Sequence, residues 1–363
     1  MRIVIACPSY PPQETTCGVG DYTRCLAEEL ARRGEHVTVV TSAAWRGPAH
    51  GIVTVLPILD GSAPWWRVVA ADVVNLQYTP ELYRDRVRAL RVTLSIPTVV
   101  TFHTLHSTTL RSRALALGLL ASARHVVAAN EEVTGIVRRR VPWAARRLTE
   151  IPIGSNIAVA PPGDGAATRA SVGASARAPL LAHFGLVYPG KGLETLLEAL
   201  AIVRAMHPEA RLVVIGDTRE TDRAYRSDLE ALAVQLGVAR AVTWTGRRDD
   251  EDVSRLLAAA DVFVAPFDGG ASLRRGSLIA GLAHGLPVVA TSSPAPSAYL
   301  RDGENVALVP ARNPAALATR IVALLDAPDD RRRLADGARK LAARVAWPAI
   351  AEETRAVFRR VLA

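Results

Sequence analysis

The stretch LLAHFGLVYPGKGLETLLEALAIVRAM, residues 180–206, decides the fold class of this chain. It opens with an apolar run over residues 180–184, crosses a glycine-rich loop and continues as a helical pattern over residues 192–206. A further apolar run follows at residues 211–215. An apolar strand, a helix and a second apolar strand form the repeating unit of a parallel sheet covered on both faces. The stretch therefore predicts a doubly wound α/β domain.

The same alternation runs along the rest of the chain in two series. The first series has a helix at residues 21–33 and apolar runs at residues 2–7, 36–41, 52–57, 72–77, 98–102, 125–129 and 148–153. The second series continues with strands at 241–244, 261–265 and 287–291 and helices at 222–236, 249–259 and 272–284. We therefore expect two α/β domains, over residues 1–160 and 180–346, each built around its own parallel sheet.

The segments outside these two series have their own character. Residues 161–179 are rich in Ala, Gly, Pro and Ser and have no clear period, which indicates an interdomain linker. Residues 347–363 form an amphipathic helical pattern that we expect to pack back across the first domain. Ligands of doubly wound folds bind at the carboxyl ends of the strands. The expected site is therefore the cleft between two facing domains.

The composition of the chain excludes several classes of protein. Of the 363 residues, 49% are hydrophobic and 22% are charged, which excludes a disordered chain. No apolar run approaches the roughly 18 residues of a membrane span, and proline interrupts the first apolar run too early for a signal peptide. Three cysteines, Cys7, Cys17 and Cys25, form neither a disulfide framework nor a zinc pattern. We expect a cytoplasmic protein, and association with the inner face of the membrane stays open.

The net charge of +9 is concentrated in the first domain. Residues 1–160 hold 18 Arg against 12 Asp and Glu, which gives +6, and the remainder holds 26 Lys and Arg against 23 Asp and Glu, which gives +3. The densest cluster is Arg138, Arg139, Arg140, Arg146 and Arg147. Such a patch attracts nucleic acid, anionic lipid or a phosphorylated substrate, although a solvated helix face is the simpler explanation. With 5% aromatic residues there is no stacking set for nucleic acid, so we expect no nucleic-acid partner.

Two loops between a strand and a helix carry glycines suited to phosphate. The loop before the first helix ends in Gly18 and Gly20, which allow close approach of a ligand, or form a plain tight turn. It lacks the third glycine of a dinucleotide fingerprint. The loop after the strand at residues 180–184 contains Gly185 and Lys191. Only two of the 44 basic residues are lysines, and a lysine at a helix start predicts a phosphate site rather than a surface lysine.

A third glycine loop, residues 268–276, precedes the helix expected at residues 272–284. Ser272 is the candidate helix cap, and Arg274 and Arg275 follow it. Helix-start amides together with these two arginines would bind a second part of a pyrophosphate.

Together these features resemble the retaining, nucleotide-sugar-dependent glycosyltransferases of the GT-B fold, specifically family 4. The resemblance covers nearly the whole chain. It rests on Gly18-Val-Gly20, Thr101-Phe-His103, Ile151-Pro-Ile-Gly154, Lys191-Gly before a Leu-Leu helix, and residues 260–266, 285–290 and 302–305. It implies two Rossmann-like domains that face each other across a cleft. It also implies transfer of a hexose from a UDP- or GDP-sugar with retention of configuration, and no cofactor or required metal.

The chain departs from the family pattern at two places. Leu186 stands where the family usually has an arginine, and Ser272 and Ala280 stand where it usually has two glutamates. Our hypothesis is that Arg274 or Arg275 replaces the missing arginine, because an arginine from another loop can reach the same oxygens. Ser272 would then hydrogen-bond the sugar without a charge.

The resemblance implies roles for particular residues. The expected catalytic residues are His103, Lys191, Arg274 and Arg275. The expected donor-binding residues are Gly18, Gly20, Gly185, Lys191, Gly216, Asp217, Gly246, Arg247, Ser272, Leu273, Arg274, Arg275, Gly276 and Ser277. The expected acceptor-binding residues are Tyr10, Gln77, Tyr78, His103 and His106. Tyr10, Gln77 and Tyr78 lie at strand ends, and each serves equally well in packing or capping. The spacing of His103 and His106 would suit a metal, but without an acidic or thiol ligand nearby we expect none.

The implied mechanism stabilises the leaving phosphate with Lys191, an arginine of the pair 274–275 and helix-start amides. With no carboxylate nucleophile at the expected place, front-face displacement is favoured over a covalent glycosyl-enzyme. The acceptor stays unknown, and an anionic or membrane-associated compound fits the basic first domain. The alternatives are an inactive sugar-nucleotide-binding partner subunit, motivated by the missing glutamates, and an epimerase or phosphorylase of the same double fold.

Overall fold

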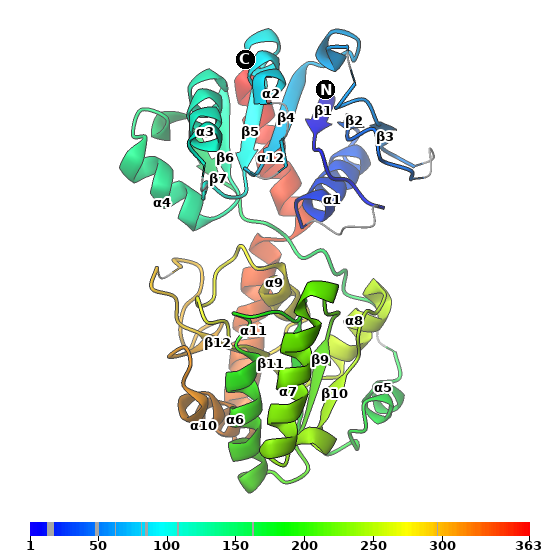
Figure 1. Ribbon diagram of the computed structural model, residues 1–363, viewed down its shortest axis with the longest axis vertical. Helices are drawn as coiled ribbons and strands as arrows, with labels where there is room; N and C mark the ends of the chain where they lie inside the picture. Colours follow the sequence, from blue (N-terminus) through cyan, green and yellow to red (C-terminus); the bar gives the residue numbers. More distant parts are fainter. Residues whose placement is uncertain are drawn as a thin grey trace. The chain divides into compact units, whose positions relative to one another are not determined.

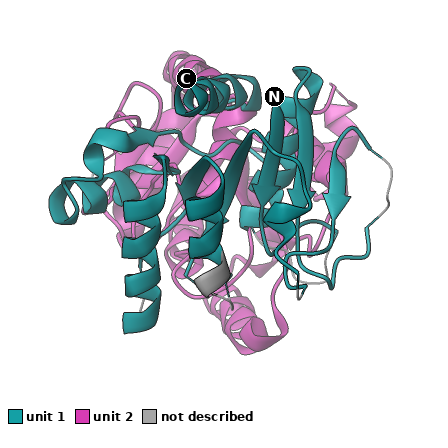
Figure 2. Ribbon diagram, turned by 90° about the horizontal axis from the view of Figure 1, so that it is seen from above, with its two compact units in different colours: residues 1–156, 345–363 teal, residues 157–344 magenta. Residues whose placement is uncertain are grey.

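A computed structural model describes residues 1–12, 18–47, 51–61, 63–80, 82–83, 86–106, 109–161, 163–295 and 297–363, without the side chains of residues 86–88. The chain divides into two compact units (Figures 1 and 2). Unit 1 comprises residues 1–156 and 345–363, and unit 2 comprises residues 157–344.

Unit 1 is built on a seven-stranded parallel sheet of order β3-β2-β1-β4-β5-β6-β7. Its strands are β1 (Arg2–Ala6), β2 (His36–Val40), β3 (Thr54–Leu56), β4 (Val73–Tyr78), β5 (Thr98–Phe102), β6 (His125–Ala128) and β7 (Leu148–Glu150). Its helices are α1 (Gly18–Arg32), α2 (Arg86–Ser95), α3 (Leu110–Ser122), α4 (Glu131–Arg140) and α12 (Trp347–Leu362), with single 3₁₀ turns at Trp65–Arg67 and Ala145–Arg147. The central strands β4, β5 and β6 are buried along their whole length, as a parallel sheet covered on both faces requires.

Unit 2 repeats this topology with a six-stranded parallel sheet of order β10-β9-β8-β11-β12-β13. Its strands are β8 (Leu180–Phe184), β9 (Arg211–Ile215), β10 (Val242–Trp244), β11 (Val262–Ala265), β12 (Val288–Thr291) and β13 (Ala307–Val309). Its helices are α5 (Gly165–Ser171), α6 (Leu193–Met206), α7 (Arg223–Gln235), α8 (Asp250–Ala258), α9 (Gly276–Ala283), α10 (Pro314–Asp326) and α11 (Pro328–Arg344), with 3₁₀ turns at Glu220–Asp222 and Ala239–Ala241. Two doubly wound α/β units confirm the predicted fold class.

In both units the strand order reverses next to the first strand, between β1 and β4 in unit 1 and between β8 and β11 in unit 2. The loops that leave two such neighbouring strands run to opposite faces of the sheet, so they leave a crevice at its carboxyl edge. In unit 2 these are the loops that carry Lys191 and Arg275.

The structure differs from the predicted linker over residues 161–179. Helix α5 lies within this segment, and the Asp164 carboxylate caps it by accepting hydrogen bonds from the amides of Ala166 and Ala167. The Arg169 guanidinium pairs with Asp261 at 3.1 Å and donates to the carbonyl of Ala259. A helix of seven residues is too short to show a clear hydrophobic period. The sequence pattern therefore did not reveal that this segment belongs to unit 2.

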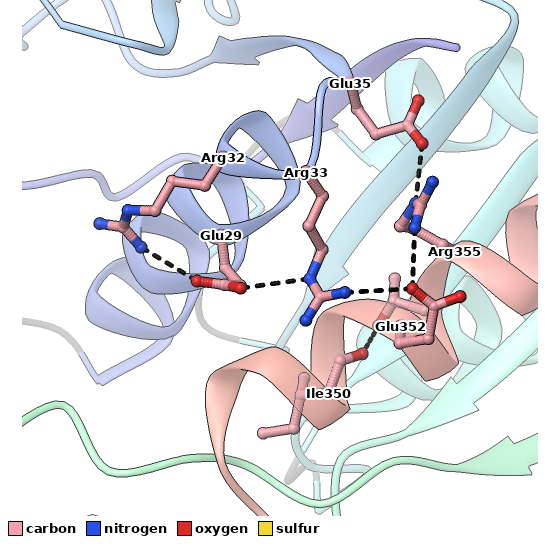
Figure 3. Close-up of polar contacts among 8 residues, drawn as sticks. Glu29, Arg32, Arg33, Glu35, Ile350, Glu352 and Arg355 are labelled. Carbon is pink, nitrogen blue, oxygen red and sulfur yellow. Dashed lines mark hydrogen bonds and ion pairs between the residues drawn. The ribbon is translucent and has the colours of Figure 1, made fainter.

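Helix α12 joins unit 1 although the whole of unit 2 precedes it in sequence. Its Ile350 and Phe358 are buried in the same core as Leu26 and Leu30 of α1. Ion pairs lie beside this core (Figure 3). Arg33 pairs with Glu352 at 3.2 Å, and Arg355 pairs with Glu35 at 2.8 Å and with Glu352 at 2.8 Å, so the connection between α1 and β2 and helix α12 join in one network.

Candidate functional site

The carboxyl ends of β8 and β9 stay paired beyond the strands. The amide of Gly185 donates to the carbonyl of Ile215 at 2.9 Å, and the amide of Val187 donates to the carbonyl of Asp217 at 2.9 Å. At Gly216, whose φ is +140°, a Cβ atom would lie 2.1 Å from the carbonyl oxygen of Gly185. Only glycine fits there, so Gly185 and Gly216 bring two loops side by side.

Lys191 is the central cation of these loops. Its side chain is 8% exposed, and its Nζ lies 5.0 Å from the ring centroid of Tyr188 and 5.3 Å from that of Phe267. Within the described part of the chain its ammonium makes no hydrogen bond or ion pair. Burial, together with the charges of Arg275 and Arg219, lowers the pKa of Lys191 to about 8. A buried ammonium that contacts aromatic rings rather than a carboxylate can still donate its hydrogen bonds to a bound anion.

Arg275 reaches the same place from the loop after β11. Its guanidinium carbon lies 4.1 Å from the ring centroid of Phe267, and its Nε donates to the carbonyl of Gly270 at 3.1 Å. A Cβ atom at Gly185 would lie 3.2 Å from Lys191 Nζ and 3.6 Å from Ser277 Oγ. The lysine and the first turn of α9 are therefore both neighbours of Gly185, whereas Arg274 is exposed.

The expected cap at Ser272 is wrong, because α9 begins at Gly276 and Arg275 occupies the N-cap position. The amide of Arg275 donates to the carbonyl of Ser272, so residues 272–275 form a turn before the helix. Ser272 Oγ is buried and has no hydrogen-bond partner among the described residues. Leu273 is 2% exposed and packs in the core, which leaves its backbone and not its side chain for a ligand.

The remaining expected donor residues lie on neighbouring loops. Gly246 bridges to Gly216 and has a φ of +65°, and Arg247 beside it is exposed. Asp217 is exposed and its carboxylate accepts from the amide of Thr218. Gly18 and Gly20 lie in the first turn of α1 rather than in a loop. A Cβ atom at Gly20 would lie 2.9 Å from the carbonyl oxygen of Ser9, so packing against the chain after β1 accounts for this glycine.

A chain of hydrogen bonds fixes His103 in unit 1. The carbonyl of Val99 accepts from Asn75 Nδ2 at 3.2 Å, the Asn75 oxygen accepts from Gln77 Nε2, and the Gln77 oxygen lies 2.8 Å from His103 Nε2. Because a carbonyl only accepts, each amide is oriented in turn and His103 Nε2 must donate. Burial lowers the pKa of His103 to about 3. The imidazole is therefore neutral at pH 7 with Nδ1 as a hydrogen-bond acceptor, and it is too weak a base to remove a proton.

Three expected acceptor-binding residues are buried instead. The side chains of Tyr10, Gln77 and Tyr78 are 5%, 0% and 0% exposed. Tyr10 packs on Trp45, and Tyr78 lies between aromatic rings with a centroid distance of 5.0 Å to Phe102. Apolar packing and the hydrogen-bond chain explain these residues, so in this structure none of the three presents its side chain to a ligand.

The side chains of His103 and His106 do not form a common metal site. His103 Nε2 is engaged by Gln77, and the exposed His106 pairs with Glu132. In the part of the chain that the structure describes, no group of three His, Cys, Asp or Glu side chains is placed to hold a metal ion. The spacing of these two histidines is therefore explained by separate partners.

Sequence analysis missed four residues around Lys191: His183, Tyr188, Arg219 and Phe267. His183 is completely buried, donates from Nδ1 to the carbonyl of Val264 at 2.9 Å, and leaves Nε2 without a partner among the described residues. Burial, with the charge of Lys191, lowers its pKa to about 4. Arg219 stacks on Tyr188, with its guanidinium carbon 5.5 Å from the ring centroid. Spacing in sequence shows none of these contacts, because they depend on pairing between loops.

Two family models cover most of the chain. Residues 16–159 match "Glycosyltransferase Family 4", and residues 178–327 match "Glycosyl transferases group 1". A phosphatidyl-myo-inositol mannosyltransferase of Mycobacterium leprae is 30% identical over 99% of this chain and 97% of its own. A D-inositol 3-phosphate glycosyltransferase of Acidothermus cellulolyticus is 28% identical over 95% of this chain and 86% of its own.

Solved structures agree on the architecture. HepE of Anabaena, solved with UDP and glucose, aligns with a TM-score of 0.77 at 21% identity over 99% of this chain and 100% of its own. Sucrose-phosphate synthase of Thermosynechococcus elongatus aligns with a TM-score of 0.75 at 21% identity over 99% of this chain and 98% of its own.

The fold and the matches define an enzyme class, a glycosyltransferase of the GT-B type. Within that class, the chain belongs to glycosyltransferase family 4, which confirms the resemblance drawn from its motifs. The chain is therefore a glycosyltransferase, and the alternative of an inactive partner subunit is not pursued. None of the helices in the described part of the chain combines the length and apolar character needed to cross a membrane.

Proposed function

We propose that this glycosyltransferase moves a hexose from a nucleoside diphosphate sugar to a hydroxylated acceptor, with retention of configuration and without a required metal ion. The observation that carries the proposal is Lys191, a buried ammonium without a carboxylate partner among the described residues, next to Arg275 and α9. Breaking the bond between sugar and diphosphate places negative charge on the leaving phosphate. Cations already held in place stabilise that charge without reorganisation, which is the task a divalent ion performs elsewhere.

The resemblance to family 4 implies retention, and the same group of residues favours one route to it. Ser272 and Ala280 offer no carboxylate at the two positions where the family pattern has glutamates. We therefore propose that the acceptor attacks from the face that the phosphate leaves, and that the phosphate oxygen takes up the acceptor proton. His103 is too weakly basic to take that proton, and we assign its Nδ1 the role of orienting a hydroxyl group by accepting a hydrogen bond.

For the acceptor, we propose a phosphorylated polyol, free or linked to lipid. The names of two relatives contain phosphatidyl-myo-inositol and D-inositol 3-phosphate, both phosphorylated polyols. Exposed arginines at the end of α4, Arg138, Arg139 and Arg140, give unit 1 a cationic surface that attracts such anions.

A binding and transfer experiment tests the proposal. The purified protein is titrated with UDP, GDP, ADP and dTDP in the presence of EDTA, and the matching sugar donors are then offered with inositol phosphates. We expect one diphosphate to bind and raise the melting temperature, and proton NMR of the product to show the anomeric configuration of the donor. Absence of binding by every diphosphate, or an inverted product, would overturn the donor or the stereochemical assignment respectively.

Donor binding should take up a proton at Lys191. In the free protein the pKa of Lys191 is lowered to about 8, and a bound polyanion raises it by favouring the ammonium. Binding is therefore strongest below pH 8 and weakens as pH rises through that value. We expect the Kd of the diphosphate to increase about tenfold between pH 7 and pH 9, measured by calorimetry.

The control for this pH dependence is Lys191→Arg. Arginine stays charged over the whole range, so the Kd of this variant should change little between pH 7 and pH 9. A Kd of the unaltered protein that does not vary over this interval would contradict the lowered pKa of Lys191 as the cause of a pH dependence in binding.

A further inference from the structure

We propose that Arg219 binds the donor diphosphate and supplies the arginine that is missing at Leu186. The inference rests on the proposed function and extends it, because it assigns a third cation to the donor site, from the loop after β9. The site would then hold the diphosphate between Arg219 of the β9 loop, Lys191 of the β8 loop and Arg275 of the β11 loop.

Backbone pairing brings Arg219 to the site. Val187 and Thr218 form an isolated parallel bridge beyond β8 and β9, so the next residue of each loop, Tyr188 and Arg219, emerge as neighbours. The Arg219 guanidinium carbon lies 5.5 Å from the ring centroid of Tyr188, and Lys191 Nζ lies 5.0 Å from the same centroid. One aromatic ring therefore connects the two cations.

A second ring extends the arrangement to Arg275. The Phe267 centroid lies 5.3 Å from Lys191 Nζ and 4.1 Å from the Arg275 guanidinium carbon. The five side chains form a ladder in which cations and rings alternate: Arg219, Tyr188, Lys191, Phe267 and Arg275. Ring faces attract cations weakly compared with a carboxylate, and they leave the N–H donors available.

Two carboxylates next in sequence to members of this ladder pair with other arginines. Within the described part of the chain, Arg219 and Lys191 make no ion pair. Glu220, next in sequence to Arg219, approaches Arg223 at 3.7 Å, and Asp268 pairs with Arg312 at 3.0 Å. Two cations held close together without an ion pair, Arg219 and Lys191, repel each other, and a diphosphate relieves that repulsion with a matching negative charge.

The loop register explains why Arg219 can replace an arginine at position 186. The bridge between Val187 and Thr218 places Leu186 beside Asp217 and keeps both residues at the same carboxyl edge. Leu186 is 36% exposed, so its side chain occupies a partly open position in the loop that carries Lys191. An arginine from either loop reaches this edge, and the chain carries it on the second loop.

The test compares diphosphate and monophosphate binding in Arg219→Gln. By calorimetry with UDP, UMP, GDP and GMP, we expect the variant to bind the preferred diphosphate about tenfold more weakly, and the monophosphate within about twofold of the unaltered protein. Arg223→Gln is the matched control, because Arg223 is also exposed, lies four residues on and pairs with Glu220. It should change neither affinity.

A second variant tests the replacement itself. Leu186→Arg in the Arg219→Gln background should restore diphosphate affinity to within about threefold of the unaltered protein. Unchanged diphosphate affinity in Arg219→Gln, or an equal loss for mono- and diphosphates, overturns the inference and leaves the proposed function standing. Failure of the unaltered protein to bind any diphosphate overturns the proposed function instead.

Discussion

Replacing Lys191 with methionine should lower kcat/KM for sugar transfer by about 10³-fold. The lysine ammonium is the one cation of the ladder that is nearly buried, and a group that stabilises developing charge in such surroundings contributes far more than an exposed one. Methionine has about the same length as lysine and keeps the apolar contacts of the side chain. The neighbouring rings of Tyr188 and Phe267 therefore stay packed. Initial rates at several donor concentrations measure the effect.

The chain provides a matched control for this variant. Lys340, the other of its two lysines, lies exposed on α11, and Lys340→Met should leave kcat/KM unchanged. The melting temperature of Lys191→Met should not fall, because removal of a buried charge without a partner does not destabilise a fold. Transfer within a factor of about three of the unaltered enzyme would refute the assignment of Lys191 to the leaving phosphate.

Replacing Phe358 with alanine should lower the free energy of unfolding of unit 1 by about 3–5 kcal/mol. The Phe358 ring is completely buried between α12 and the sheet of unit 1, so its removal loses apolar contacts and leaves a cavity. Leu362→Ala, on the same helix but 39% exposed, should change the free energy by less than about 1 kcal/mol.

Tryptophan fluorescence in a urea titration can report this change for unit 1. Five of the six tryptophans, at positions 45, 65, 66, 143 and 347, lie in unit 1, and only Trp244 lies in unit 2. An unaltered midpoint for the fluorescence transition of Phe358→Ala would show that α12 does not contribute to the core of unit 1.

The sequence predicted the elements with the strongest patterns. Long apolar strands such as Val73–Tyr78 and Thr98–Phe102 have no other explanation than a covered parallel sheet. The short strand Ala307–Val309 was missed because three residues carry no period. The start of α9 was placed four residues early, since Ser272 looks like a cap but serves in the preceding turn.

The residues of the site could also be predicted only in part. Lys191 and Arg275 stand out in sequence because each lies beside glycines at a helix start, and the structure brings both to the ring of Phe267. Arg219 could not be found this way, because its approach depends on the bridge between Val187 and Thr218. Tyr10 was assigned to a ligand although it is buried, since a strand-end position does not tell which way a side chain points.

The placement of α12 also determines the order in which the chain can fold. Unit 2 is continuous in sequence, so all of its strands are synthesised before α12. Unit 1 is interrupted, and its core lacks Ile350 and Phe358 until the last part of residues 345–363 is synthesised. The unit whose strands are translated first therefore has to wait for α12, and until that helix is synthesised the apolar residues of α1 that pack against it lack their partners.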